Sequence, residues 1–391
     1  MLEEYRLVSN RTARRDAPWT PAQNDILSDK AYANAFEAVS NWPGYAPTPL
    51  VSLSEIAAEF GVASLHYKDE GSRFGLGSFK ALGGAYAVAR LLQKELSRRL
   101  GREISMQEVT DRAHPEAGDI TVCCATDGNH GRSVAWGAER FGARCVIFIH
   151  ATVSEGRRAA IAKYGAEVRR VSGNYDESVR EAQRTATAEG WFVVSDTSYP
   201  GYLDVPRDVM QGYEIMAAEA LRALPEPPTH VFVQTGVGGM AAAVAAQVKR
   251  QFGDTRPRVI LGDPLEAACW LASFEAGEPV AVEGDLDTLM AGLACGEVSL
   301  LAWEVLKDHC DAAVGIPEAS VGRWMRRLAR RTPPVTAGES AIAGLAAAEA
   351  CCLDAAWRRQ LDLNEGSRLL VFGSEGDTDP EVYRAILEQA D

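Results

Sequence analysis

The sequence predicts an α/β fold that is built on mostly parallel sheets flanked by helices. Three observations lead to this prediction. Short apolar strands alternate with helical segments along most of the chain. Polar, glycine-bearing loops directly follow three of the strands, after Ala125, Gln234 and Phe372. No clean linker divides the chain, so we expect a second domain to be an insertion into the first.

The composition is that of an ordinary globular protein of two or three domains, with 391 residues of which 47% are apolar and 24% are charged. The net charge of −14 and the lack of a basic run argue against nucleic acid or an anionic membrane as a partner. Eight cysteines are too few for a disulfide scaffold, and the adjacent pairs lack zinc-ligand spacing, so we expect no metal. The first four residues lack the features of a signal peptide, and we expect a cytoplasmic protein.

The order of elements follows from the spacing of apolar residues. Residues 1–47 are polar and carry Pro18, Pro21 and Pro43, so they predict an irregular arm with short helices. Short apolar runs predict strands at 65–68, 120–125, 145–149, 167–171, 191–194, 230–234, 259–261 and 369–372. Apolar residues at helical spacing, or long segments between strands, predict helices at 78–94, 132–141, 154–164, 178–189, 209–221, 240–252, 297–310, 318–330 and 339–358, and a last helix closes the chain.

Lys80 is the first candidate for chemistry. It lies in the first turn of a predicted helix, within the segment 74–84 that is otherwise mostly apolar and glycine-rich. The positive end of the helix dipole and desolvation would both lower the pKa of this amine, which a Schiff-base lysine requires. A surface lysine whose stem covers apolar neighbours is the alternative for this segment taken alone.

The loop 125–131, Ala-Thr-Asp-Gly-Asn-His-Gly, is the second candidate. Its glycines allow the backbone to approach a small ligand closely. Asn129 offers a donor and an acceptor, and Asp127 offers a base. An ordinary turn is the alternative, because Asp-Gly is also a common turn signal.

The loop 234–240, Gln-Thr-Gly-Val-Gly-Gly-Met, stands directly before a predicted helix. Consecutive backbone N–H groups at a helix N-terminus form an anion-binding nest suited to phosphate. The loop is not the dinucleotide fingerprint, because its third glycine comes too early. A glycine turn selected for packing is the alternative.

The last candidate is the polar loop 372–379, in which Ser374 could bond a heteroaromatic nitrogen. Taken alone, it could equally be a C-terminal turn. Together the four segments supply an amine nucleophile, a phosphate nest, groups that orient a ring and a carboxylate. This set suits pyridoxal phosphate better than a nucleotide, because a nucleotide does not need the lysine.

Three of these segments resemble sequence motifs of a known enzyme family. The patterns Phe-Gly-x-x-x-Phe-Lys-x-Leu-Gly-Gly, Thr-Asp-Gly-Asn-His-Gly-Arg and Gly-Val-Gly-Gly-Met resemble the fold-type II, tryptophan synthase β-like, pyridoxal-phosphate enzymes. The chain is similar, more narrowly, to the diaminopropionate ammonia-lyase family over roughly residues 45–385. Asp127 stands where serine and threonine dehydratases usually have Ser. Further motifs that carry the narrower resemblance are Asp196-Thr197, Gly201-Tyr202, Met210 to Tyr213, Met290 to Glu297, Gly338-Glu339-Ser340 and Glu375 to Asp379.

The resemblance implies the cofactor pyridoxal 5′-phosphate and a role for each matching residue. Lys80 would carry the cofactor, Asn129 would bond its phenolic oxygen and Ser374 would face its pyridine nitrogen. The phosphate would lie against Gly236, Val237, Gly238, Gly239 and Met240. Asp127 and Asp196 would act at the substrate, and we also expect the substrate at Thr126 and His130. Cys269 and Cys295 match regions of the family that could approach each other, and we interpret them as two buried thiols.

The family cleaves 2,3-diaminopropionate to pyruvate and two ammonia molecules and can accept both enantiomers, so we expect an ammonia-lyase, with a homodimer implied by the resemblance. We predict a large domain of residues 1–85 and 204–391, a small domain of residues 86–203 and a site in the cleft between them. A serine, threonine or 3-hydroxyaspartate dehydratase of the same fold is the nearest alternative. A nicotinamide-dependent oxidoreductase and a non-catalytic binding protein are more remote ones. Three segments near the site depart from the family pattern, namely residues 77–78, 198–200 and 262–264.

Overall fold

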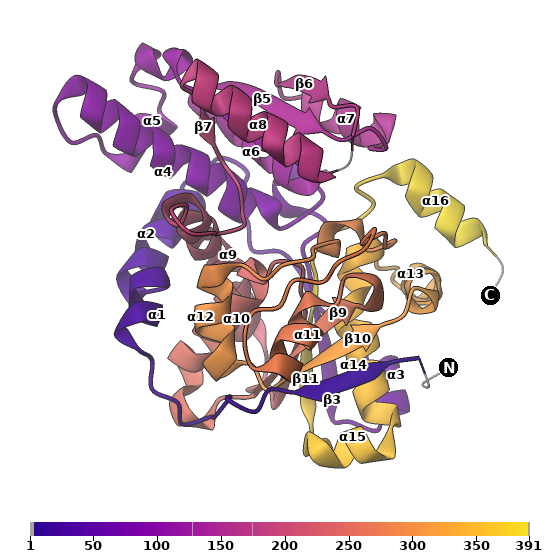
Figure 1. The fold of residues 1–391 in the computed structure, drawn as a ribbon. Helices are drawn as coiled ribbons and strands as arrows, with labels where there is room; N and C mark the ends of the chain where they lie inside the picture. The colour runs from indigo at the N-terminus through magenta and orange to yellow at the C-terminus, as the bar shows by residue number, and fades with distance from the viewer. Residues whose placement is uncertain (1–3, 127, 174, 390–391) are drawn as a thin grey trace.

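The computed structural model describes residues 4–126, 128–173 and 175–389, which form two sheets and the helices that cover them (Figure 1). In the larger sheet, five parallel strands are flanked on each side by one short antiparallel strand. Its strands, in spatial order, are β1 (Arg6–Ser9), β10 (Ala312–Ile316), β9 (Arg258–Pro264), β8 (His230–Gln234), β11 (Arg368–Gly373), β3 (Ser64–Asp69) and β2 (Leu50–Ser52).

The smaller sheet is fully parallel. It has the order β6 (Glu167–Arg170), β5 (Arg144–Ile149), β4 (Thr121–Ala125) and β7 (Phe192–Val193). The helices packed around it, or close to it in sequence, are α5 (Met106–Thr110), α6 (Asn129–Phe141), α7 (Glu155–Ala162) and α8 (Tyr175–Glu189). This part occupies the upper half of Figure 1, and the larger sheet lies below it.

The larger sheet is covered on both faces, as its parallel strands require. Side chains alternate along β8, so that Val231 and Val233 face one core cluster and Phe232 faces the other. The first cluster includes α2 (Asp29–Ser40), α9 (Asp204–Ala223), α10 (Gly239–Phe252), α11 (Cys269–Ala276) and α12 (Leu300–His309). The second includes α3 (Ser54–Phe60), α13 (Ala319–Arg330), α14 (Ala343–Leu353) and α16 (Pro380–Glu388).

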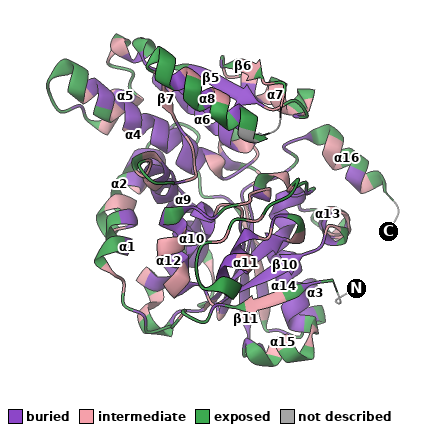
Figure 2. Ribbon diagram, in the orientation of Figure 1, coloured by how far each residue is buried: buried purple, intermediate pink, exposed green. Residues whose placement is uncertain are grey.

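Two helices are central to the packing of the larger sheet and to its contact with the smaller one. The helix α14 is apolar nearly all round, Ala-Gly-Leu-Ala-Ala-Ala-Glu-Ala-Cys-Cys-Leu, and it is buried along nearly its whole length beneath the strands (Figure 2). The helix α4 (Lys80–Leu100) packs against both α6 and α9, and it therefore joins the two parts of the molecule. The remaining helices, α1 (Pro21–Ile26) and α15 (Ala355–Gln360), are short.

The predicted α/β fold and the predicted inner strands are confirmed, with ends that shift by a few residues. Residues 339–358, where we expected helix to dominate, are helical except at their start and at one break. Residues Glu339–Ile342 form a 3-10 turn, and the chain breaks between α14 and α15, where the Asp354 carboxylate caps α15 by accepting from Ala356 N at 2.8 Å and Trp357 N at 2.9 Å. The strands β1, β2 and β10 were not expected.

The predicted domain boundaries remain predictions. The helix α4 runs through the first of them, between residues 85 and 86, and α9 begins at Asp204, next to the second. Within the described part of the chain, no helix combines the length and the apolar character needed to cross a membrane.

Candidate active site

The carboxyl ends of strands from both sheets border one cavity. The loops after β4, β8 and β11 all reach it, as the alternation of strands and helices predicts. The residues that line it include Phe79, Lys80, Thr126, Asn129, His130, Arg157, Asp196, Tyr213, Gln234, Gly236, Val237, Gly238, Gly239, Met240, Cys295, Glu339, Ser340, Ser374 and Glu375. The structure thus brings together every described residue that the sequence placed in the site. Asp127 lies outside the described residues.

Lys80 is the first residue of α4, and its amine is paired with a carboxylate across the cavity. Its Nζ lies 2.6 Å from Oδ2 of Asp196, and both side chains are about one-fifth exposed, at 19%. Burial disfavours the charged amine, but the opposing attraction of Asp196 outweighs it, so the pKa of Lys80 is raised. The expected lowering of this pKa is therefore wrong, because the carboxylate that raises it belongs to Asp196, 116 positions further along the sequence.

Asp196 is held in its charged form by the same pair. Burial alone would raise the pKa of this carboxyl, but the charges of Lys80 and of His130 lower it well below its usual range. His130 donates from Nε2 to the carbonyl oxygen of Val194 at 2.8 Å. This leaves its Nδ1 buried, without a hydrogen-bond partner among the described residues and 3.8 Å from Oδ2 of Asp196.

The loop after β4 is ordered by Thr126. Its hydroxyl oxygen accepts from the N–H groups of Gly128 and Gly131, each at 3.1 Å, which brings the loop into the first turn of α6. Asn129 points into the cavity from that turn, and its Nδ2 donates to the Glu375 carboxylate. A carboxylate from the loop after β11 thus holds the side-chain amide of Asn129 in the predicted ligand-binding loop.

The glycine loop after β8 leads into α10. The carbonyl oxygen of Gly236 accepts from Trp270 Nε1 at 2.8 Å, and that of Val237 accepts from Ser299 N at 2.9 Å. Gly238 has a φ of 102°, and a Cβ there would lie 2.2 Å from the indole of Trp270. Because the carbonyl groups are directed to these partners, the N–H groups of the loop and of the first turn of α10 are free to bind an anion.

The sequence did not single out several cavity residues as individual side chains. Gln234 has both amide atoms buried without partners among the described residues, and Glu339 has one such oxygen. Burial, together with the charge of Glu375, raises the pKa of Glu339 to about 7. Arg157, from α7, lies 3.8 Å from the same carboxylate. Glu339 and Tyr213 lie within motifs noted for the resemblance, and Gln234 begins the glycine loop 234–240, whereas no sequence signal indicated Arg157.

The two cysteines of interest differ in exposure. Cys269 is fully buried, as expected, whereas Cys295 is only partly buried and borders the cavity. No disulfide bond joins these two thiols in this structure. The expectation that Cys295 is a buried thiol is therefore wrong, because the 3-10 turn Ala291–Leu293 leads it to the cavity edge. Within the described ranges, no group of three or more His, Cys, Asp or Glu side chains is placed to hold a metal ion.

Comparison with known proteins identifies the family. A family model described as pyridoxal-phosphate dependent enzyme matches residues 42–374. The diaminopropionate ammonia-lyase of Salmonella typhimurium is 35% identical over 387 residues, which cover 96% of each chain, and that of Escherichia coli is 38% identical over 353 residues, which cover 88% of each chain. The chain belongs to the diaminopropionate ammonia-lyase family of pyridoxal-phosphate dependent enzymes.

Solved structures agree with this assignment to the diaminopropionate ammonia-lyase family. The E. coli diaminopropionate ammonia lyase in complex with an aminoacrylate-PLP azomethine reaction intermediate has a TM-score of 0.87 and 33% identity to this chain, over 98% of this chain and 97% of that one. As a member of a pyridoxal-phosphate dependent family, the chain has the fold-type II architecture and uses pyridoxal 5′-phosphate.

The residues that line the cavity fit this cofactor, independently of the comparison with known proteins. The Lys80 amine lines the cavity, a glycine loop at a helix N-terminus can take the phosphate, and Ser374 lies in the cavity wall just after β11. Buried polar atoms of His130, Tyr213, Gln234 and Glu339 lack partners among the described residues, and a polar ligand would supply them. The donor set therefore suits a phosphorylated, polar heteroaromatic aldehyde.

Proposed function

We propose that the protein catalyses the α,β-elimination of 2,3-diaminopropionate, in the D form, the L form or both. One water is consumed, and pyruvate and two ammonia molecules are released. The Cα–H and Cβ–N bonds break, a Cα=Cβ bond forms, and hydrolysis of the resulting imine releases the second nitrogen. The observation that carries the proposal is the ion pair between Lys80 and Asp196, which shows that this carboxylate holds an ammonium group inside the cavity.

Pyridoxal phosphate, when bound, withdraws electrons from the substrate Cα and so labilises its proton. The residues that would hold it are Lys80, the loop Gly236 to Gly239 with Met240, Asn129 and Ser374. The amide of Asn129 is already positioned by Glu375, and the glycine loop by Trp270 and Ser299. These contacts reduce the reorganisation that binding requires.

The proton transfers are assigned to Lys80 and Asp127, which would act on opposite faces of the substrate and so serve opposite enantiomers. Asp196 would hold the β-amino group in its protonated form. This matters because a β-ammonium leaves as neutral ammonia, whereas a neutral amine would have to leave as an amide anion. Thr126 and His130 are assigned to the substrate site because Thr126 shapes the loop after β4 and His130 lies beside Asp196.

Pyruvate formation by the cofactor-loaded protein tests the proposal. The substrates are D- and L-2,3-diaminopropionate, D- and L-serine, L-threonine and 3-hydroxyaspartate. We expect fast turnover of at least one diaminopropionate enantiomer, slow turnover of serine and none in Lys80→Ala. Preferred turnover of a hydroxy amino acid would instead favour a dehydratase of the same fold.

The homodimer and the cytoplasmic location are further parts of this proposal, and both rest on the resemblance. Light scattering on the purified holoenzyme should give twice the chain mass of 42.1 kDa. A mass equal to that of one chain would contradict the dimer.

A further inference from the structure

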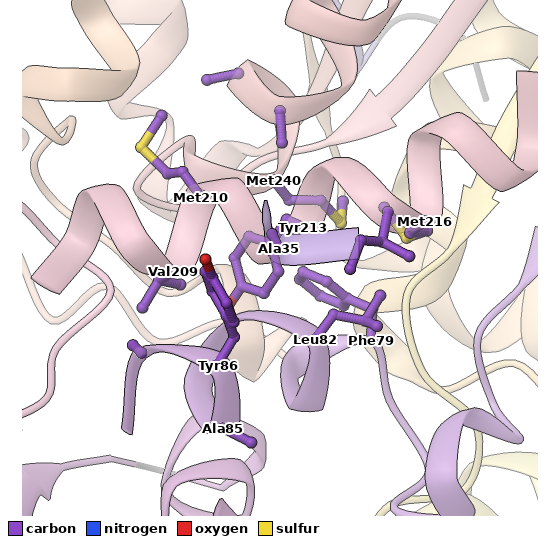
Figure 3. Close-up of a cluster of buried hydrophobic side chains, with 14 of the residues drawn as sticks. Ala35, Phe79, Leu82, Ala85, Tyr86, Val209, Met210, Tyr213, Met216 and Met240 are labelled. Atoms are coloured by element: carbon purple, nitrogen blue, oxygen red, sulfur yellow. The ribbon is translucent and has the colours of Figure 1, made fainter. Parts of the chain in front are cut away.

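Tyr213 is a buried residue of the cavity that the proposed mechanism does not use. It lies on α9, is 1% exposed, and its ring packs beside that of Phe79 at a centroid distance of 4.6 Å (Figure 3). Its hydroxyl is buried and makes no hydrogen bond of ordinary geometry among the described residues, and the polar group that approaches it is the Lys80 amine, which acts on its pKa as a hydrogen-bond partner. Leaving such a group unpaired costs free energy, so its presence at the cavity wall indicates a ligand that pairs with it.

The ammonium group of Lys80 indicates what that ligand is. Its Nζ lies 2.6 Å from the Asp196 carboxylate, 5.4 Å from the centre of the Phe79 ring and 5.8 Å from the centre of the Tyr213 ring. A cation thus lies beside a carboxylate and near two aromatic faces, an arrangement that favours ammonium ions. When Lys80 carries the cofactor, its nitrogen no longer presents a free ammonium group to Asp196, and the place is open to another cation.

We propose that Asp196 and Tyr213 form an ammonium subsite for the β-amino group of the substrate. In this subsite the Tyr213 hydroxyl oxygen accepts a hydrogen bond from one N–H group of the substrate ammonium. In the structure, the ammonium of Lys80 lies at this place, beside Asp196 and near the Tyr213 ring. The proposal rests on the proposed function, because it names the residue that completes substrate recognition at the same site. It assigns to Tyr213 a contact with the leaving group.

The charge state of Tyr213 agrees with this role. Burial raises the pKa of the phenol, and the opposite effects of Lys80 and Asp196 leave it raised, so the hydroxyl keeps its proton at neutral pH. A neutral phenol oxygen accepts from an ammonium, while its own O–H remains available to a carboxylate. The subsite therefore needs no second anion, because the single negative charge of Asp196 balances the single positive charge of the substrate ammonium.

A binding experiment without catalysis tests the subsite directly. Lys80→Ala removes the resident ammonium, and methylammonium chloride is the probe. We expect methylammonium to raise the melting temperature of the cofactor-free Lys80→Ala protein in a saturable way. Tetramethylammonium chloride at equal concentration is the control, because it has the charge but no N–H donors.

The Tyr213 contribution is measured by adding Tyr213→Phe to Lys80→Ala. This change removes one oxygen and keeps the ring that packs on Phe79. We expect methylammonium to bind about tenfold more weakly or worse, as for a lost hydrogen bond to a charged group. Equal binding in the two proteins would exclude Tyr213, and equal effects of the two salts on Lys80→Ala would overturn the subsite.

The holoenzyme provides the second readout. In Tyr213→Phe, we expect kcat/KM for diaminopropionate to fall about tenfold or more and kcat/KM for D-serine, which carries a neutral hydroxyl on Cβ in place of the ammonium, to change by less than about twofold. Tyr86→Phe is the matched control, because Tyr86 is a buried tyrosine of the same cluster that does not line the cavity (Figure 3). Equal losses on both substrates would overturn the proposal. If the wild-type enzyme did not turn over diaminopropionate, the proposed function would fail, whereas the methylammonium result would still decide the subsite.

Discussion

Lys80 and Asp196 set each other's charge. A buried amine alone would lose its proton readily, and a buried carboxylate alone would keep one. At 2.6 Å, the pair reverses both tendencies, so that the pKa of Lys80 is raised and that of Asp196 is lowered. The pair therefore favours the charged form of both groups, and Lys80 becomes a nucleophile only when it gives up a proton.

The first prediction removes the carboxylate. In Asp196→Asn, the attraction is lost while the burial of the amine remains, so the pKa of Lys80 should fall from above its ordinary value to below it. Competitive labelling of the cofactor-free protein with acetic anhydride, followed by mass spectrometry of the Lys80 peptide, gives the reactive fraction against pH. The labelling curve of Lys80 should move to lower pH in Asp196→Asn.

Two controls accompany this labelling. The exposed Lys30 should be labelled equally in the two proteins. Asp204→Asn removes an exposed carboxylate paired with Arg207 and should leave the Lys80 curve unchanged. A Lys80 curve that did not move in Asp196→Asn would show that the ion pair does not control the amine.

At the scale of elements, the loop between β8 and α10 depends on Gly238. Its φ of 102° is strained for any other residue, and an added Cβ would lie 2.2 Å from Trp270 Cζ2, which is itself buried and fixed. The indole cannot retreat without releasing its hydrogen bond to the carbonyl of Gly236. A side chain at position 238 should therefore displace the phosphate loop.

The second prediction is that Gly238→Ala weakens binding of pyridoxal phosphate at least tenfold, as measured by titrating the cofactor-free protein and following absorbance. Gly277→Ala is the matched control, because Gly277 also has a positive φ, of 80°, but a Cβ there meets nothing within 4 Å. The control should lose about 1 kcal/mol of stability and retain its cofactor affinity. Equal affinity in Gly238→Ala and the wild type would show that the loop adapts to the side chain.

The elements that the sequence predicted are those with strong local signals. The inner strands other than β10 and the helices α4, α6 and α10 carry clear apolar spacing, and their loops carry the glycine motifs that place Lys80, Asn129 and the phosphate loop. The strand β1 lies in a polar arm and exists because Arg6 to Ser9 pair with β10, whose own alanine-rich sequence gives little strand signal. Edge strands of this kind are set by tertiary pairing more than by local preference.

The side-chain pairs of the site were harder to predict for the same reason. The contact between Lys80 and Asp196 joins residues 116 positions apart, and the contact between Asn129 and Glu375 joins residues 246 positions apart. No local pattern encodes such a distance. Only the resemblance indicated Asp196, and neither route predicted that its charge would raise the pKa of Lys80.

At the scale of the whole molecule, a buried ionic network ties the segment before Lys80 to α9. Glu219, on α9, accepts from Lys68 Nζ at 2.7 Å and from Arg73 Nη2 at 2.6 Å. Glu70 accepts from Arg73 Nε and Nη2, each at 2.8 Å. All four side chains are at most 5% exposed, so two cations and two anions balance within the core.

This network connects the larger sheet to the helix that also carries Tyr213. It spans the end of β3, the 3-10 turn Arg73–Gly75 and α9, and the chain continues from that turn into Lys80. The position of Lys80 relative to Tyr213 therefore depends on the network as well as on local packing. Its loss should loosen both sides of the cavity.

The third prediction concerns Glu219→Gln. The amide keeps the volume but not the charge, so Lys68 and Arg73 are left with Glu70 as the one carboxylate among these four, and removing one partner of a buried pair costs about 3–5 kcal/mol. Urea unfolding should show this loss as a lower midpoint. Glu181→Gln, which breaks the exposed pair with Arg184, should leave the midpoint unchanged. If Glu219→Gln unfolded at the wild-type midpoint, the network would not hold the segment before Lys80, and the alignment of the cavity would have to come from the packing of α4 against α6 and α9 instead.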